Sequence, residues 1–508
     1  MQHINMNMKR FSEWSVLCLL FCLSSCFKDE TTNGTGLISE ITIEEGCIKP
    51  VYDINKNETL TVTPVISQSN ADKPVTYTWE IDRKVYSRDK QLVFVGKELG
   101  SFPCRLIVEN EDGKAFFTFT LNVNTPYEEG ITVISNDAEG NSMLSFMLKQ
   151  RTEGVADHFA DGDCFSINNP EHPFVRNVAD VVQCDGSLIL ACQGDPAAGQ
   201  APTIYYLHEK TLVVENMFTV NEYEDFKPYR ILLPSHGTAG TMYPILCENG
   251  KVYELSPTEG AVGRPLKFKS EYTLNGFIYD SGSASYNNVY LWDKAYGDLC
   301  MLYSGYGPYY CSPTYLYSPE TGTGDEDENY FKGYEPIFMF LPRAVGGNSD
   351  FAQDIVVITA KNGMYQKTIL NRNLWYYNTD TQENILSDYG GMKIAGFSCR
   401  LTERTPYVAT EKYNYLLYGD GNKVMRWIYS QSQMLHDARN VATVGSGQAV
   451  ITAMELSLDH TETFVAFYEP DEEGLNGHVW VLDTESGAVL RQYDHVCYRP
   501  TRIIYKKK

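Results

Sequence analysis

Aromatic side chains gather in one stretch between residues 303 and 334, where glycine and proline interrupt any regular structure. A tyrosine ring can lie flat on a sugar or a peptide while its hydroxyl group hydrogen-bonds, so this stretch is a candidate binding loop. Packing of a long loop onto the fold is the alternative interpretation of the same rings. The candidate ligand-binding residues, with a second aromatic group that follows them, are Tyr306, Tyr309, Tyr310, Tyr315, Tyr317, Tyr330, Tyr334, Trp375, Tyr376 and Tyr377.

Oxygen ligands suited to calcium stand close together at Asp325, Asp327 and Asn329. The segment lacks the glycine and the distant glutamate of an EF-hand loop, so a solvated acidic loop is the favoured interpretation and calcium the weaker one. No other metal or cofactor is predicted, because no cysteines and histidines stand at the spacing of a zinc site.

Motifs of catalysis are missing from the sequence. It contains no G-x-S-x-G, no H-E-x-x-H, no phosphate-binding loop and no dinucleotide-binding glycine pattern. With 65 Asp and Glu residues, the choice of two as a glycosidase pair would be arbitrary. We therefore expect a binding protein. A surface-displayed glycoside hydrolase or polysaccharide lyase on a propeller scaffold is the alternative, since a fold alone does not exclude an enzyme.

Composition narrows the class of protein. A formal net charge of −23 without a basic stripe argues against nucleic acid as a partner. The 36 tyrosines and the near absence of long helical periodicity predict an all-β chain, and 508 residues predict more than one domain. Cys47 and Cys104 fall in one predicted domain and are candidates for a disulfide, whereas most other cysteines sit in apolar runs as small buried residues.

The first 25 residues have the pattern of a secretory signal, with a basic pair and an apolar run too short to span a bilayer. The segment Leu23-Ser24-Ser25-Cys26 resembles the lipobox of bacterial lipoproteins, which implies that Cys26 carries lipid such as palmitate. We expect an outer-membrane protein that faces the cell exterior on a flexible lipidated tether, residues 26–37. The residues that resemble a surface-export signal are Lys28, Asp29 and Glu30.

Residues 38–124 alternate in short segments around a central tryptophan, Trp79. Two of these segments flank Asp112-Gly113, a strong hairpin signal, and the whole predicts an immunoglobulin-like sandwich. Tyr77-Thr78-Trp79 and the segment 100–113 resemble a PKD domain, in which the tryptophan fills the core. Residues 125–130 form a linker by composition.

From residue 131 to residue 508, apolar strands and Asx/Gly turns recur, which predicts a β-propeller. We expect seven blades, with six or eight as alternatives. The strand at residues 131–134 is expected to complete the terminal blade and close the ring. The predicted turns are Asp185-Gly186, Asn249-Gly250, Asn287-Asn288, Asn362-Gly363, Asp420-Gly421 and Asn476-Gly477.

Lipobox, PKD-like domain and propeller-like remainder together resemble the PKD-like family lipoproteins. The resemblance implies an accessory role in nutrient capture at the cell surface, beside a SusC/SusD-type outer-membrane importer. We expect the protein either to bind a glycan or peptide ligand or to dock on the importer. The resemblance implies no catalytic residues.

Overall fold

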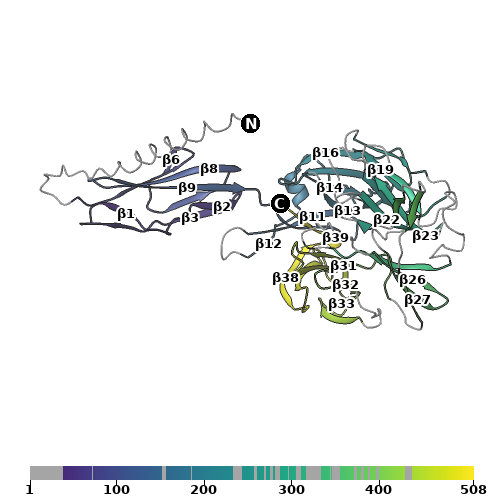
Figure 1. Cartoon of the computed structure of the whole chain (residues 1–508). Helices are drawn as coiled ribbons and strands as arrows, with labels where there is room; N and C mark the ends of the chain where they lie inside the picture. The colour runs from purple at the N-terminus through teal and green to yellow at the C-terminus, as the bar shows by residue number, and fades with distance from the viewer. Residues whose placement is uncertain are drawn as a thin grey trace, which may run out of the picture. The chain divides into compact units, whose positions relative to one another are not determined.

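The protein is described by a computed structural model, in which two compact units meet between Val123 and Asn124 (Figure 1). Within the described residues, strands dominate, and helical structure is limited to α2 (Cys164–Asn168) and the short 3-10 helix η1 (Pro196–Ala198). No helix in this part of the chain is long and apolar enough to cross a membrane. The described residues are 38–150 except 71, 156–232 except 185, 243–256, 260–267, 271–274, 279–280, 287–304 except 296, 311–315, 333–343, 345, 355–370, 375–378, 383–386, 390–395, 400–429 and 438–508.

The first unit is a two-layered β structure. A five-stranded sheet, in the order β2-β9-β8-β5-β6, shares one core with the pairs β3–β7 and β1–β4. The strands are β1 (Ile41–Ile43), β2 (Val51–Asn55), β3 (Thr59–Val62), β4 (Ile66–Gln68), β5 (Thr76–Ile81), β6 (Lys84–Ser87), β7 (Leu92–Val95), β8 (Gly100–Glu109) and β9 (Lys114–Asn124).

Trp79 lies at the centre of this core with 1% of its surface exposed, as the sequence predicts. Its indole Nε1 donates to the carbonyl oxygen of Asp89 at 2.9 Å, which satisfies its buried polar atom. The predicted hairpin between β8 and β9 is also present. The side-chain oxygen of Asn110 accepts from the backbone N–H groups of Asp112 and Gly113, both at 2.9 Å, and closes the turn.

The candidate disulfide between Cys47 and Cys104 is not formed, and both thiols are free. Cys104 is a small core residue, and burial raises the pKa of its thiol to about 11. The Sγ atom of Cys47 instead lies 3.8 Å from the carbonyl oxygen of Val65. Sharing a domain was a weak criterion, because pairing requires close and well-directed Cβ atoms.

The second unit consists, over its described residues, of seven four-stranded antiparallel sheets and one extra hairpin. Sheet 1 is β39 (Arg499–Lys506), β10 (Gly130–Asn136), β11 (Ser142–Leu148) and β12 (His158–Phe159). Sheet 2 is β13 (Val178–Cys184), β14 (Ser187–Cys192), β15 (Thr203–His208) and β16 (Val214–Thr219), and sheet 3 is β17 (Pro228–Ile231), β18 (Tyr243–Cys247), β19 (Val252–Ser256) and β20 (Ala261–Pro265). Sheet 4 is β21 (Tyr279–Asp280), β22 (Asn287–Asp293), β23 (Asp298–Ser304) and β24 (Cys311–Tyr315).

The later sheets continue the same meander pattern. Sheet 5 is β25 (Glu335–Phe340), β26 (Ile355–Lys361), β27 (Met364–Leu370) and β30 (Gly390–Ala395), and the extra hairpin, β28 (Trp375–Asn378) with β29 (Glu383–Leu386), precedes β30. Sheet 6 is β31 (Tyr407–Thr410), β32 (Tyr415–Asp420), β33 (Lys423–Ile428) and β34 (Arg439–Thr443). Sheet 7 is β35 (Val450–Leu456), β36 (Glu462–Tyr468), β37 (Gly477–Asp483) and β38 (Val489–Cys497).

Apolar clusters join these sheets face to face in a closed cycle. Successive clusters connect sheets 1 and 2, sheets 2 and 3, sheets 3 and 4, sheets 4 to 6, and sheets 6 and 7. The last cluster returns to the start, because Ile131 and Val133 of sheet 1 pack with Phe464 and Val481 of sheet 7. Radial packing of four-stranded meanders that closes on itself is the propeller-like arrangement predicted from the sequence.

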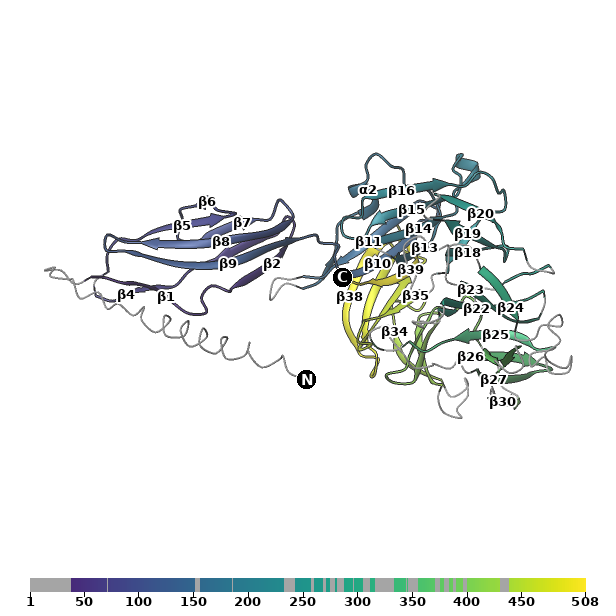
Figure 2. The same ribbon diagram turned by 45° about the horizontal axis from the view of Figure 1, so that its top comes forward.

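Sheet 1 combines strands from the two ends of the second unit. β10 pairs with β39 from Gly130 opposite Lys506 to Asn136 opposite Arg499, and Figure 2 shows the yellow β39 beside the blue β10 and β11. The predicted closing strand therefore does pair with the end of the chain. It does so inside a sheet of its own, because β35 to β38 already complete sheet 7.

Turn chemistry explains the hairpin between β26 and β27, whereas two of the predicted turns are wrong. Asn362 and Gly363 connect β26 to β27 with φ of 53° and 73°, a left-handed pair that Asn-Gly tolerates well. Asn287 and Asn288 form no turn. They begin β22 and pair with Ser304 and Tyr303, because the apolar strand that follows them extends backwards through both residues. Gly477 of the predicted turn Asn476-Gly477 already lies in β37, where it pairs with Tyr468.

Candidate functional site

Most of the site residues predicted from the sequence lie outside the described residues, namely Cys26, Lys28, Asp29, Glu30, Tyr306, Tyr309, Tyr310, Tyr317, Asp325, Asp327, Asn329 and Tyr330. Tyr315 ends β24, and Trp375, Tyr376 and Tyr377 lie on β28, paired with β29. Tyr334 is half-buried, and the Nζ atom of Lys361 lies 4.9 Å from its ring centre. The structure thus leaves the aromatic binding loop a prediction.

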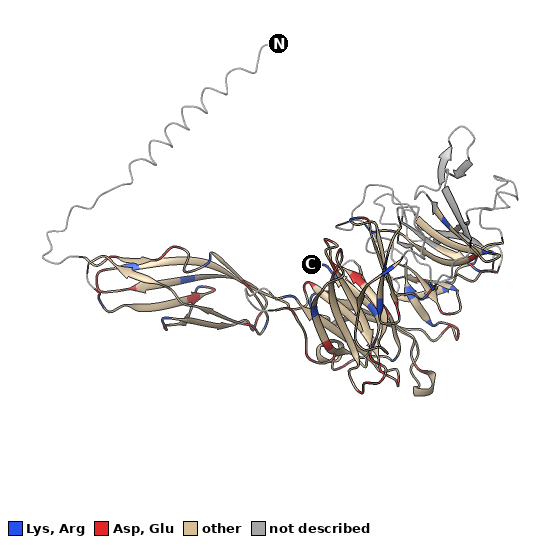
Figure 3. Ribbon diagram, turned by 90° about the horizontal axis from the view of Figure 1, so that it is seen from below, with Lys and Arg blue, Asp and Glu red and all other residues tan. Residues whose placement is uncertain are grey.

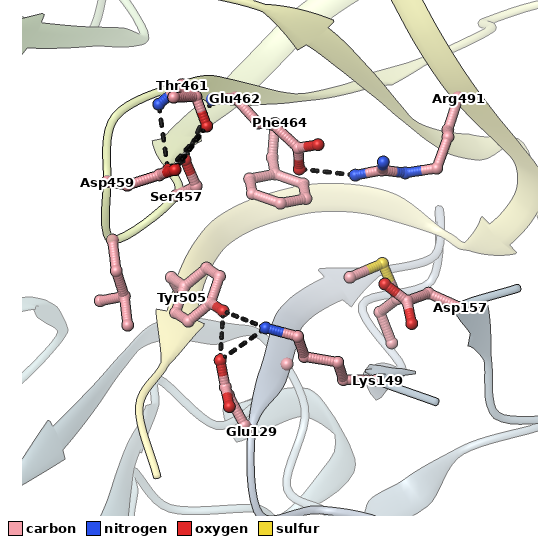
Figure 4. A pocket seen from close by; sticks show the side chains of 13 residues that line it. Glu129, Lys149, Asp157, Ser457, Asp459, Thr461, Glu462, Phe464, Arg491 and Tyr505 are labelled. Atoms are coloured by element: carbon pink, nitrogen blue, oxygen red, sulfur yellow. Dashed lines mark hydrogen bonds and ion pairs between the residues drawn. The ribbon is translucent and has the colours of Figure 1, made fainter. Parts of the chain in front are cut away.

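A groove between sheets 1 and 7, with a cavity volume of about 370 Å³, is the candidate site (Figure 4). One wall consists of the beginning of the second unit together with β39, and the other belongs to sheet 7. Closure of the ring brings these two walls together. The lining residues are Glu129, Gly130, Met147, Lys149, Asp157, Ser457, Leu458, Asp459, Thr461, Glu462, Phe464, Arg491 and Tyr505. Gly130 permits the close approach of β10 to β11, because a Cβ atom there would lie 2.1 Å from the carbonyl oxygen of Met147.

A bonded trio forms the first wall. The carboxylate of Glu129 accepts from Lys149 Nζ at 2.8 Å and from the Tyr505 hydroxyl at 2.6 Å, and Lys149 Nζ lies 3.3 Å from that hydroxyl. Burial and the hydrogen bond to Glu129 raise the pKa of Tyr505 to about 12. Burial lowers the pKa of Lys149, but its bond to Glu129 and the nearby charges outweigh burial, so the pKa is raised. Lys149 therefore stays an ammonium group and Tyr505 a neutral phenol at neutral pH.

The opposite wall presents two more ordered carboxylates. Asp459 accepts from the hydroxyl groups of Ser457 at 2.6 Å and Thr461 at 2.7 Å, and these bonds lower its pKa to about 2. Glu462 pairs with Arg491, whose Nη2 lies 2.5 Å from the carboxylate. In Figure 4 the ring of Phe464 stands on the same wall as this pair.

Four carboxylates and two cations line the groove, since Asp157 adds to the three carboxylates already described. The site is therefore acidic, which disfavours an anionic ligand. Ordered acceptors next to an apolar ring suit a hydroxyl-rich ligand, because hydroxyl groups donate to carboxylates while the ring covers the apolar face. Figure 3 shows the basic residues of the described chain dispersed among the strands.

A second cluster of charges lies where the first strands of sheets 1, 2 and 3 contact one another. Asp180 on β13 is 1% exposed, and its Oδ1 lies 3.4 Å from Arg502 Nε and 3.8 Å from Arg230 Nη1. Its Oδ2 accepts from the backbone N–H of Ile231 at 2.8 Å. Arg343 pairs with Glu455 of β35, and the charges of both residues act on Arg502. Both carboxylates thus have an arginine partner, which makes this cluster a link between sheets rather than an acid–base pair.

Sequence reasoning missed the groove entirely. No motif marks it, because Glu129 falls in the predicted linker and the other charged residues are single positions in unrelated segments. The available signal was the predicted pairing of residues 131–134 with the end of the chain, which brings the two walls together.

Comparisons with known proteins reveal distant structural likenesses alone. No family model and no curated protein matches the sequence. A quinonprotein alcohol dehydrogenase-like protein from Bacteroides thetaiotaomicron is 14% identical, with 92% of this chain and 99% of that chain covered and a TM-score of 0.42. A candidate 6-phosphogluconolactonase from Bacteroides uniformis is 10% identical, with 74% and 99% covered and a TM-score of 0.42. Likenesses this weak carry no argument about activity.

Proposed function

We propose that this chain is a non-enzymatic lipoprotein that binds a neutral glycan at the cell surface and serves a SusC/SusD-type importer. The observation that supports the proposal is the groove between sheets 1 and 7. It offers ordered carboxylates, two cations and the ring of Phe464 to a polar ligand, and its carboxylates already accept hydrogen bonds from neighbouring groups. A basic peptide is the other ligand that an acidic groove suits.

In this proposal each part of the protein has a separate role. Lipid on Cys26 holds the chain in the outer membrane, with Lys28, Asp29 and Glu30 directing it outward. The first unit is a PKD-like spacer, and the seven sheets of the second unit are the blades of a seven-bladed propeller. Tethering beside an importer raises the effective concentration of captured ligand, so modest affinity at each site suffices.

The ligand proposal is tested by measuring binding of the purified mature chain to an array of neutral oligosaccharides. The same array carries basic peptides, so that the two ligand classes are compared directly. We expect Glu462→Gln and Lys149→Met to weaken binding of a retained glycan by about tenfold or more each, as for hydrogen bonds to charged groups. Glu139→Gln, an exposed change in the hairpin between β10 and β11, serves as the matched control and leaves affinity unchanged.

Three results would overturn the proposal. Glycan turnover by the purified protein would make it an enzyme. Binding of peptides alone would replace the ligand class, and glycan binding unaffected by both groove variants would move the site elsewhere. The anchor has its own test. Cys26→Ala should release the protein from membranes, and protease added to intact cells should degrade the wild-type protein.

A further inference from the structure

Two histidines and a glutamate meet at one end of sheet 7, and none of them lines the groove. Glu472 lies in the loop before β37, His478 is the second residue of β37, and His495 lies near the end of β38. One ligand atom from each of these three side chains lies within 4.8 Å of the other two. Within the described residues, no other histidine, cysteine and carboxylate group of this kind is found.

The imidazole of His478 stands between two carboxylates. Its Nδ1 is 3.0 Å from Asp494 Oδ1, and its Nε2 is 3.1 Å from Glu472 Oε2. A neutral imidazole has one N–H and one lone pair, so it cannot donate to both carboxylates. With its proton on the Asp494 side, the lone pair of Nε2 faces Glu472 Oε2, and a metal ion between these two atoms would turn their repulsion into two favourable contacts.

Packing fixes this imidazole in place. His478 is 4% exposed and stacks on Phe467, with ring centres 5.0 Å apart and planes 13° apart. Asp494 is held in turn by the indole Nε1 of Trp480 at 3.1 Å. A carboxylate that orients the far nitrogen of a histidine is the usual outer shell of a metal ligand, since it fixes the tautomer and raises ligand basicity.

A bulge in β38 brings the third ligand into place. The pairing of β37 with β38 shifts from Gly477 opposite Cys497 to Val479 opposite Tyr493, so the stretch that contains His495 bulges out of the register. His495 itself adopts a left-handed φ of 57°, an uncommon backbone state for a residue with a side chain. Its Nδ1 thereby comes within 3.5 Å of Glu472 Oε2, and its ring centre within 4.9 Å of that of His478.

We propose that Glu472, His478 and His495 bind a divalent transition metal, zinc above all, with Asp494 as the positioning residue. Bonds of about 2.0–2.2 Å in a tetrahedron place neighbouring ligand atoms about 3.3–3.6 Å apart, close to the 3.1 Å and 3.5 Å contacts of Glu472. Metal binding at His495 Nδ1 replaces its 2.9 Å contact with the carbonyl oxygen of Leu475. Three protein ligands leave the fourth position for water or a ligand group, and Glu472 and His495 are exposed to solvent there.

Equilibrium dialysis of the purified mature chain against Zn²⁺ tests the proposal, with bound metal measured per chain. We expect one tightly bound Zn²⁺ and, with Co²⁺ in its place, the intense visible bands of a tetrahedral ion. Glu472→Gln and His495→Gln should each weaken binding by more than about 100-fold, and Asp494→Asn by about 10- to 100-fold. Because Glu472 and His495 are exposed, these variants should melt as the metal-free wild type does.

His158→Gln is the matched control, since this exposed histidine lies on β12 outside the cluster, and it should bind Zn²⁺ as the wild type does. Equal loss of binding in His158→Gln would show non-specific surface binding and overturn the proposal. So would Zn²⁺ binding that survives in the Glu472→Gln, His495→Gln double variant, or a wild type that binds no Zn²⁺. The metal site is independent of the glycan proposal, because none of its ligands lines the groove.

Discussion

Replacement of Asp180 by asparagine should show how strongly the charge cluster at the centre of the ring stabilises the second unit. Asn has nearly the same shape but no charge, so Arg502 and Arg230 lose the carboxylate that lies 3.4 Å and 3.8 Å from them. The Asp180 side chain is 1% exposed, and its Oδ1 accepts no hydrogen bond in the described part of the chain. These two guanidinium charges therefore compensate it.

The expected loss is about 2–4 kcal/mol in the free energy of unfolding. Removal of one partner of a fully buried ion pair costs about 3–5 kcal/mol. The cost here is lower because the contacts of 3.4 Å and 3.8 Å are longer than those of a hydrogen-bonded ion pair. For roughly 385 residues between Asn124 and Lys508, an unfolding entropy of about 2.1 cal/mol/K per residue makes this loss about 3–5 °C in Tm.

Thermal unfolding followed by calorimetry measures the shift, with Asp420→Asn as the matched control. Asp420 makes an exposed ion pair with Arg400 at 3.2 Å, so the same chemical change should cost less than about 1 kcal/mol. A double-mutant cycle with Arg502→Gln should show a coupling energy of at least about 1 kcal/mol, because the two residues share one interaction. Equal shifts for Asp180→Asn and Asp420→Asn would refute the reasoning.

Three further perturbations follow from the described contacts. Burial and the charge of Arg343 lower the pKa of His460 to about 4. As pH falls from about 6.5 toward 4, this histidine therefore takes up a proton in the unfolded chain but stays neutral in the folded chain. The free energy of unfolding then falls by up to about 1.4 kcal/mol per pH unit. Between pH 7 and pH 4.5 the Tm of His460→Asn should therefore decline less than that of the wild type, and parallel plots of Tm against pH would contradict the assignment. Asparagine suits this position because it tolerates the left-handed φ of 59°. Trp79→Ala should destabilise the first unit by about 3–5 kcal/mol in urea unfolding, whereas Val85→Ala, at a position that is 53% exposed, should change it little; equal effects would argue against Trp79 as the core residue. Deletion of residues 131–149 removes β10 and β11 and leaves β39 without its partner, so cooperative unfolding of the second unit should be lost, and an unchanged melt would disprove ring closure by β10.

Local patterns in the sequence predicted the strands, because alternation of apolar residues and turn residues can be recognised within a short segment. Alternation around Asn362-Gly363 and Asn110-Glu111-Asp112-Gly113 identified two hairpins, and one central tryptophan identified a core. The failures have the same origin. Asn287-Asn288 has turn composition but an apolar continuation, and Cys47 and Cys104 share a domain but form no disulfide.

The groove and the metal cluster could not be predicted because both depend on contacts between distant or irregular segments. Lys149 meets Tyr505 only after the ring has closed. His478 and His495 have no motif spacing, and a register shift in β38 brings them together. Such contacts are set by how the sheets pack, and residue type and spacing alone do not predict that packing.

The composition of sheet 1 also governs when the second unit can finish folding. Its strand β39 ends at Lys506, whereas its partner β10 begins at Gly130, so their pairing spans almost the whole unit. Contacts of such sequence separation form late, because the intervening chain must be ordered first. During synthesis the ring therefore stays open until residues 499–506 have emerged from the ribosome. Pairing of β39 with β10 is thus the step that closes the ring, and it can occur only after all the other strands have been synthesised.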